Sequence, residues 1–124
     1  MTLRELYQNI DGDYEQALRV LRMDKLIDKH IRKLTQNGVV ESLLAAGETM
    51  DRTQLFETAH AVKGVCANLG LTKLSAAASE ITENYRPGNE PRYSDAEIRE
   101  KLDALSALYA QTAAGIALYE RSAQ

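Results

Sequence analysis

The clearest helical pattern in the sequence is carried by residues 51–69, DRTQLFETAHAVKGVCANL. Apolar side chains recur here at alternating steps of four and three residues, the spacing that places them on one face of an α-helix. Asp51 is of a residue type that caps helix N-termini, so a helix over about residues 51–69 is predicted. Its apolar stripe consists of Leu55, Ala59, Val62, Cys66 and Leu69.

The same spacing predicts two further helices downstream. One covers about residues 72–86, and Gly70 before it suits the left-handed position that ends the preceding helix. The other follows Ser94, which with Glu97 matches the capping-box pattern, and a proline-containing loop separates the two. Their apolar stripes are Leu74, Ala78, Ile81 and Tyr85 in the first, and Ile98, Leu102, Leu105, Tyr109, Thr112, Ile116 and Tyr119 in the second.

The N-terminal half has a less regular pattern. Residues 3–10 and 14–21 are predicted as short helices, separated by the turn signal Asp11-Gly12-Asp13. An apolar pattern then runs from Met23 toward Gly47 with an interruption at Asn37-Gly38. We predict one long helix with a weak point at Gly38, where glycine costs about 1 kcal/mol relative to alanine. Two helices joined at Asn37-Gly38 are the alternative.

Four long helices with short connections, preceded by one or two short helices, predict an all-α protein that folds as an antiparallel four-helix bundle. The length of 124 residues favours a single domain over residues 1–124.

Composition narrows the classes of function. Fifteen basic against 18 acidic residues give a net charge of -3, which favours neither nucleic acid nor an anionic membrane as a partner. One Cys excludes an internal disulfide, and with two His nothing is spaced as a metal site. No apolar run approaches the roughly 20 residues of a membrane span, and residues 1–5 contain no apolar signal core. We therefore expect a soluble cytoplasmic protein.

His60 is the histidine that faces away from the core. It lies about 140° from the centre of the apolar stripe on a helical wheel, so its side chain is expected to face solvent. Gly64, one turn later, lies opposite the core, where glycine is costly. Because helical side chains lean toward the N-terminus, its missing side chain leaves the imidazole open to a large partner.

Lys63 leans the same way and can bring its ammonium near the imidazole of His60. His60 lies roughly 14 Å from either helix end, too far for the helix dipole to help hold an anion. Lys63 is then the nearby positive charge, and the three residues together are typical of a histidine that carries an anion.

The remaining candidate residues receive less specific interpretations. His30 lies about 55° from the apolar stripe of its helix and is expected to be a packed flank residue rather than a second site. Cys66 lies on the core stripe and is expected to be an inert buried thiol. Phe56 belongs either to the edge of the core or to a patch that docks a partner.

Residues 59–71, AHAVKGVCANLGL, followed by Leu74, resemble the signature of histidine-containing phosphotransfer (HPt) domains. The family pattern is His, an apolar residue two positions on, Lys-Gly, and a stretch of small residues that ends in Asn-Leu-Gly. The resemblance implies a phosphocarrier of a two-component phosphorelay, without kinase activity of its own. Such a carrier accepts a phosphoryl group from a receiver-domain phospho-aspartate and passes it to the aspartate of another receiver.

The resemblance also implies a role for individual residues. His60 is the phosphoacceptor, Lys63 its electrostatic support and Gly64 the position that gives access. Ala67 and Asn68 lie on the surface that docks the partner, for which Phe56 is a further candidate. The implied partners are receiver domains of response regulators and hybrid histidine kinases. Mg²⁺ is held by the receiver, so no cofactor is expected on this chain, and a monomer is expected.

Two departures from the family pattern affect the neighbourhood of His60. Val65-Cys66 stands where small residues such as Ser or Ala are common. Thr82 stands where chemotaxis kinases often have a glutamate that bonds the reactive histidine, with Glu83 beside it. Two other interpretations stay open at this point: an HPt-like module that docks a partner without turnover, and a purely structural helical bundle.

Overall fold

The computed structural model describes residues 1–122 and is all-helical over that range, as predicted. Short helices at the N-terminus precede longer ones, and no strand is present among the described residues. The elements are α1 (Leu3–Asn9), α2 (Tyr14–Leu21), α3 (Asp24–Leu34), α4 (Val39–Thr49), α5 (Arg52–Asn68), α6 (Thr72–Tyr85) and α7 (Asp95–Ser122).

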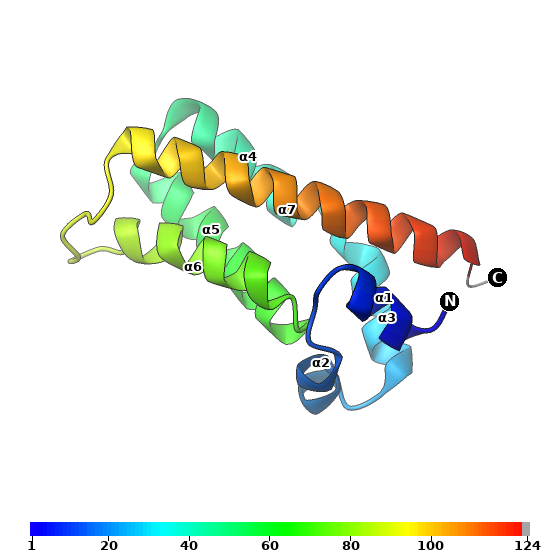
Figure 1. Cartoon of the computed structure of the whole chain (residues 1–124). Coiled ribbons are helices and arrows are strands. Elements are labelled where there is room, and N and C mark those ends of the chain that lie inside the picture. The colour runs from blue at the N-terminus through cyan, green and yellow to red at the C-terminus, as the bar shows by residue number, and fades with distance from the viewer. Residues whose placement is uncertain (123–124) are drawn as a thin grey trace.

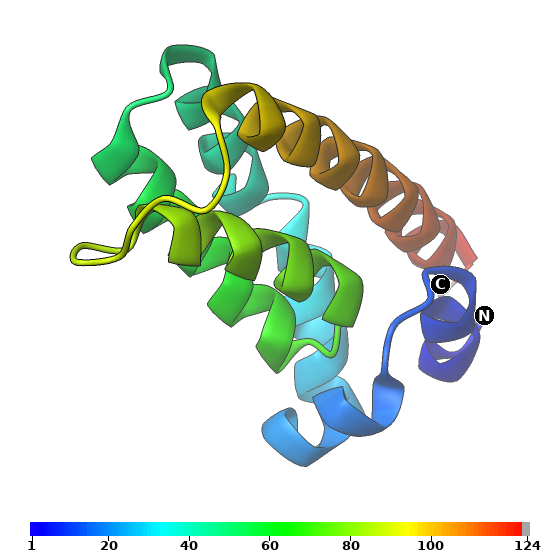
Figure 2. The same cartoon turned by 60° about the vertical axis from the view of Figure 1, so that its left-hand side comes forward.

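Helices α4 to α7 form the predicted four-helix bundle, in which successive helices run antiparallel (Figure 1). Each contacts its neighbours in chain order, and α7 also packs on α4. Helices α5 and α6 lie side by side in both views (Figure 2) and make the most extensive contact. Helix α7 is the longest and extends past the bundle onto α1 and α3. No helix among the described residues is both long and apolar enough to cross a membrane.

The apolar stripes predicted for α5, α6 and α7 form the core. Every stripe residue of α5 and α6 is buried, and the same holds for α7 except Tyr109, which is half-buried. Met23, in contrast, was expected to begin an apolar stripe but is 51% exposed. It precedes α3 as the N-cap residue, so its side chain does not follow the helical periodicity.

The prediction of one long helix through Gly38 is wrong, and the alternative of two helices is confirmed. Gly38 has a φ of 73°, in the left-handed region that glycine adopts readily, so the helix cannot continue through it. The side chain of Asn37 accepts a hydrogen bond from the backbone N–H of Val39 at 3.0 Å and supports the start of α4. Local turn chemistry therefore outweighs the continuous apolar pattern.

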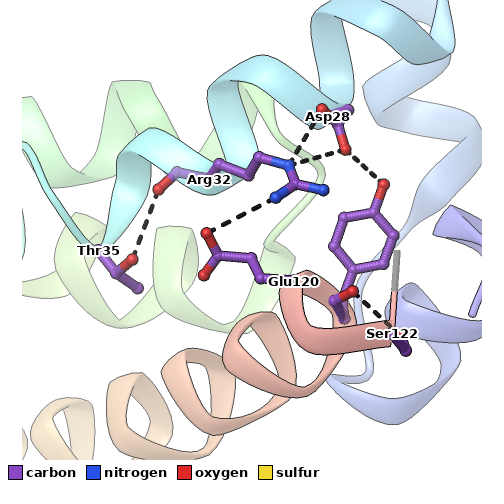
Figure 3. Close-up of polar contacts among 6 residues, drawn as sticks. Asp28, Arg32, Thr35, Glu120 and Ser122 are labelled. Carbon is purple, nitrogen blue, oxygen red and sulfur yellow. Dashed lines mark hydrogen bonds and ion pairs between the residues drawn. The ribbon is translucent and has the colours of Figure 1, made fainter. Parts of the chain in front are cut away.

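The C-terminal end of α7 is joined to α3 by a polar cluster (Figure 3). Arg32 donates to both carboxylate oxygens of Asp28, at 3.0 and 3.1 Å, and lies 3.8 Å from Glu120. The hydroxyl of Tyr119 donates to Asp28 at 2.5 Å. Burial, followed by this hydrogen bond, raises the pKa of Tyr119 to about 12, so the hydroxyl keeps its proton at neutral pH.

The connection between α5 and α6 is tied to the N-terminal helices. Gly70 has a φ of 68°, and its carbonyl accepts from the N–H of Asp13 at 2.7 Å. The buried hydroxyl of Tyr7 donates to the carbonyl of Leu69 at 2.7 Å. These contacts fix the C-terminal end of α5, the helix that carries His60.

Candidate functional site

His60 lies in the middle of α5 with its side chain exposed, as predicted. The helix begins at a cap in which the Asp51 carboxylate accepts from the N–H of Gln54 at 2.9 Å. The imidazole is stacked on the ring of Phe56, with 5.8 Å between centroids and 16° between planes. Phe56 is half-buried and also packs against the core. The structure thus places Phe56 at the edge of the core and against His60.

Gly64 lies on the same exposed surface, one turn after His60. A Cβ atom added to Gly64 would have no atom of residues 1–122 within 4 Å, apart from its own helical surroundings. Its backbone φ is not in the left-handed region. Neither packing nor backbone conformation therefore requires glycine at position 64. The remaining effect of the missing side chain is that the surface beside His60 stays accessible.

The Gly64→Ala substitution is expected to increase the free energy of unfolding by up to about 1 kcal/mol, because alanine favours the helix and the added methyl group meets open space. Urea denaturation measures this change.

The bulkier Gly64→Gln is expected to slow phosphoryl transfer from a phosphorylated receiver. Ala104→Gln, on an exposed position of α7, is the matched control. Undiminished transfer by Gly64→Gln would remove the access role.

Lys63 is half-buried and lies where α5 contacts α6. Its backbone carbonyl accepts a hydrogen bond from the hydroxyl of Ser75 at 3.1 Å, which holds the two helices together beside the site. Within residues 1–122 its side chain forms no ion pair. The ammonium group is therefore available to an incoming anion.

Two residues at the end of α6 adjoin the site and were not assigned to it from the sequence. Arg86 donates three hydrogen bonds of 2.8 to 3.2 Å to the carboxylate of Glu83, and its guanidinium carbon lies 5.3 Å from the centroid of the Phe56 ring. Arg86 lowers the pKa of Glu83 most, and Lys63 and His60 lower it further. This carboxylate therefore lies within electrostatic reach of Lys63 and His60.

Thr82, at the position of the chemotaxis-type glutamate, is fully buried. Its hydroxyl donates to the carbonyl of Ala78 at 2.8 Å, so its donor is used within α6. The adjacent Glu83 instead provides the carboxylate on the exposed side. The spacing of Glu83 and Arg86 predicts an ion pair on one helix face, but not which neighbouring helix that face meets.

Ala67 and Asn68 are exposed at the C-terminal end of α5. Asn68 borders a pocket of about 210 Å³ between α5 and α3, which Val65 and His30 also line. His30 was expected to be packed, and this was wrong: it is exposed and lines this open pocket instead of packing against α5.

Cys66 is fully buried, as predicted, and burial raises the pKa of its thiol to about 12. It therefore remains protonated at neutral pH and does not compete with His60 as a nucleophile.

The fold and the site define a small helical domain that displays a histidine in mid-helix, beside a lysine and an unobstructed glycine. Within residues 1–122 no cluster of His, Cys, Asp or Glu side chains has the arrangement of a metal site. The family model described as Hpt domain matches residues 2–108, so the chain belongs to the Hpt domain family. Members of this family carry out histidine phosphotransfer in phosphorelays and lack catalytic kinase activity.

The family match ends within α7, so Tyr119 and Glu120, the α7 members of the polar cluster, lie beyond it, whereas Asp28 and Arg32 of α3 lie within it. No curated protein and no solved structure gave a match.

Proposed function

We propose that His60 is the phosphorylated residue of this domain, accepting a phosphoryl group from the phospho-aspartate of one receiver domain and passing it to the aspartate of another. The observation that carries the proposal is the exposed imidazole of His60 next to Gly64, at which an added Cβ atom would meet no atom of the described residues within 4 Å outside its own helical surroundings. The second histidine, His30, lacks such a neighbouring glycine on its helix.

The chemistry requires a nucleophile and little more from this chain. A lone pair on a ring nitrogen of neutral His60 attacks the phosphorus, the P–O bond to the receiver aspartate breaks, and a P–N bond forms. The aspartate leaves as a carboxylate, and the proton of the other ring nitrogen is released. The onward step is the reverse, with a second aspartate as the nucleophile.

Charge near His60 supports this transfer. His60 is far from both ends of α5, so the helix dipole does not reach the phosphoryl group. We assign electrostatic support to Lys63, whose ammonium forms no ion pair within the described chain. The receiver supplies Mg²⁺ together with its aspartate.

The partner docks on the α5 surface around His60. Gly64 provides access on this surface, and the exposed side chains of Ala67 and Asn68 extend it toward the end of the helix. Phe56 borders it on the other side of His60. We propose receiver domains of response regulators and hybrid histidine kinases as the partners, with a monomeric carrier.

The proposal is tested by incubating the chain with several receiver domains phosphorylated on aspartate with ³²P. The expected result is label on the chain that is lost in acid and retained in alkali, which is the behaviour of phosphohistidine. Binding of a receiver without any label would support a docking module instead. The absence of both binding and label with all receivers tested would favour a purely structural bundle.

A further inference from the structure

We propose that Phe56 is a positioning residue for His60: its ring holds the plane of the imidazole in one orientation, so that the ring nitrogens are presented for phosphorylation in fixed directions. This inference rests on the proposed function of His60 and replaces a mere docking role for Phe56. The stacked pair, with 16° between the ring planes, is the observation from which it starts.

The residues one turn before and one turn after His60 act in opposite ways. Helical side chains lean toward the N-terminus, so the imidazole of His60 leans over Phe56, and a side chain at position 64 would lean over His60. Phe56 provides an aromatic surface, whereas Gly64 provides none and leaves open space. The imidazole is thus supported on one side and accessible from the other.

Phe56 is itself held in place from two directions. Its inner side packs against the core, and the guanidinium of Arg86 lies over its ring at 5.3 Å, within the range of a cation–π contact. Arg86 is in turn held by Glu83 through hydrogen bonds of 2.8 to 3.2 Å. The stack therefore runs from Glu83 through Arg86 and Phe56 to His60, and it links the end of α6 to the middle of α5.

The end of α6 that carries Arg86 is itself well supported. The buried side chain of Asn84 accepts from the N–H groups of Arg92 and Tyr93, at 2.7 and 2.8 Å. Asn89 donates to the carbonyl of Glu83 at 2.9 Å. The loop after α6 is folded back onto the helix, so Arg86 is placed by an ordered segment.

Orientation matters because the last torsion of a histidine side chain has broad, roughly two-fold preferences. An exposed imidazole without support therefore turns its two nitrogens through a wide range of directions. Aromatic stacking at this distance disfavours rotation of the ring out of the parallel arrangement. A fixed imidazole reacts faster with a docked receiver, because its nitrogen already lies near the line of attack.

Phosphoramidate provides a test that needs no receiver. It phosphorylates imidazole directly: its P–N bond breaks, a P–N bond to a ring nitrogen forms, and the imidazole proton leaves with ammonia. In a His30→Gln background, ³¹P NMR then reports the ratio of the two phosphohistidine isomers at His60. We expect the ratio in the folded parent chain to differ from that in the same chain unfolded in urea, because the stack exposes the two nitrogens unequally. The Phe56→Leu variant is expected to shift the ratio toward that of the same chain unfolded in urea.

The control is Phe56→Tyr, which keeps the ring and is expected to keep the isomer ratio of the parent chain. Arg86→Gln leaves both rings in place and removes the cation–π contact with Phe56 together with a surface ion pair to Glu83, so it is expected to fold and to shift the ratio in the same direction by a smaller amount. An isomer ratio that is the same in the parent, Phe56→Leu and Arg86→Gln chains would overturn the inference, whether or not receivers transfer to His60.

Transfer kinetics separate positioning from docking. With a phosphorylated receiver, Phe56→Leu is expected to lower the maximal transfer rate roughly ten-fold and to leave the half-saturating receiver concentration unchanged. A higher half-saturating concentration with an unchanged maximal rate would show a docking role and contradict the inference. If no receiver transfers to the parent chain, the proposed function fails, and the isomer ratio still decides the role of Phe56.

Discussion

Replacing His60 with glutamine is expected to abolish acid-labile labelling of the chain by every receiver that labels the parent. Glutamine keeps a polar side chain of moderate length but has no nitrogen lone pair that can form a stable phosphoryl bond at neutral pH. The imidazole is exposed, so the fold should be retained, with a change in stability within about 0.5 kcal/mol. Circular dichroism and ³²P labelling of the same sample measure both properties.

His30→Gln is the matched control, because it removes the other histidine, which is also exposed and helical. This variant should be labelled at the rate of the parent. Label that persists on His60→Gln, or disappears from His30→Gln, would show that the reactive histidine has been assigned to the wrong helix.

The Gly70→Ala substitution is expected to destabilise the fold by about 3 kcal/mol or more. Gly70 has a φ of 68°, where an alanine is strained by roughly 1–2 kcal/mol. The added Cβ would also overlap the carbonyl oxygen of Asp13 and lie 3.2 Å from the backbone nitrogen of Ala17. Both neighbours are backbone atoms, so the α1–α2 connection would have to move. The shift of the urea midpoint measures the loss.

The Gly38→Ala substitution separates the strain of a positive φ from the overlap of the added Cβ with neighbouring backbone atoms. Gly38 has a similar φ of 73°, but an added Cβ there would have no neighbour within 4 Å in the part of the chain that the structure describes. It should therefore lose only the conformational part, on the order of 1 kcal/mol. Equal losses for Gly38→Ala and Gly70→Ala would mean that the contact with Asp13 contributes nothing.

The bundle could be predicted from the sequence because its helices carry long and uninterrupted stripes. The stripe of α5 from Leu55 to Leu69 is buried without exception, and it also places His60 on the exposed side. The break at Gly38 was mispredicted, because a mean cost for glycine does not include the hydrogen bond that the Asn37 side chain makes to the start of α4. Alternative backbone bonding of this kind competes locally with apolar periodicity.

The surroundings of His60 could be predicted only in part. Positions on the same helix follow from its geometry, so Lys63 and Gly64 were placed beside the imidazole. The contact of Arg86 with Phe56 depends on how the end of α6 packs against α5. The apolar pattern of one helix gives no information about that packing. The exposure of His30 depends in the same way on the gap between α3 and α5.

The exposed position of His60 on the side of α5 also limits how long a partner can remain bound. A donor and a recipient must both reach the same nitrogen on the same face of α5, so under the proposed function they compete and occupy the domain in turn. A receiver with a long residence time would block the next one and delay the relay. Fast dissociation, and therefore modest affinity, is what this geometry favours.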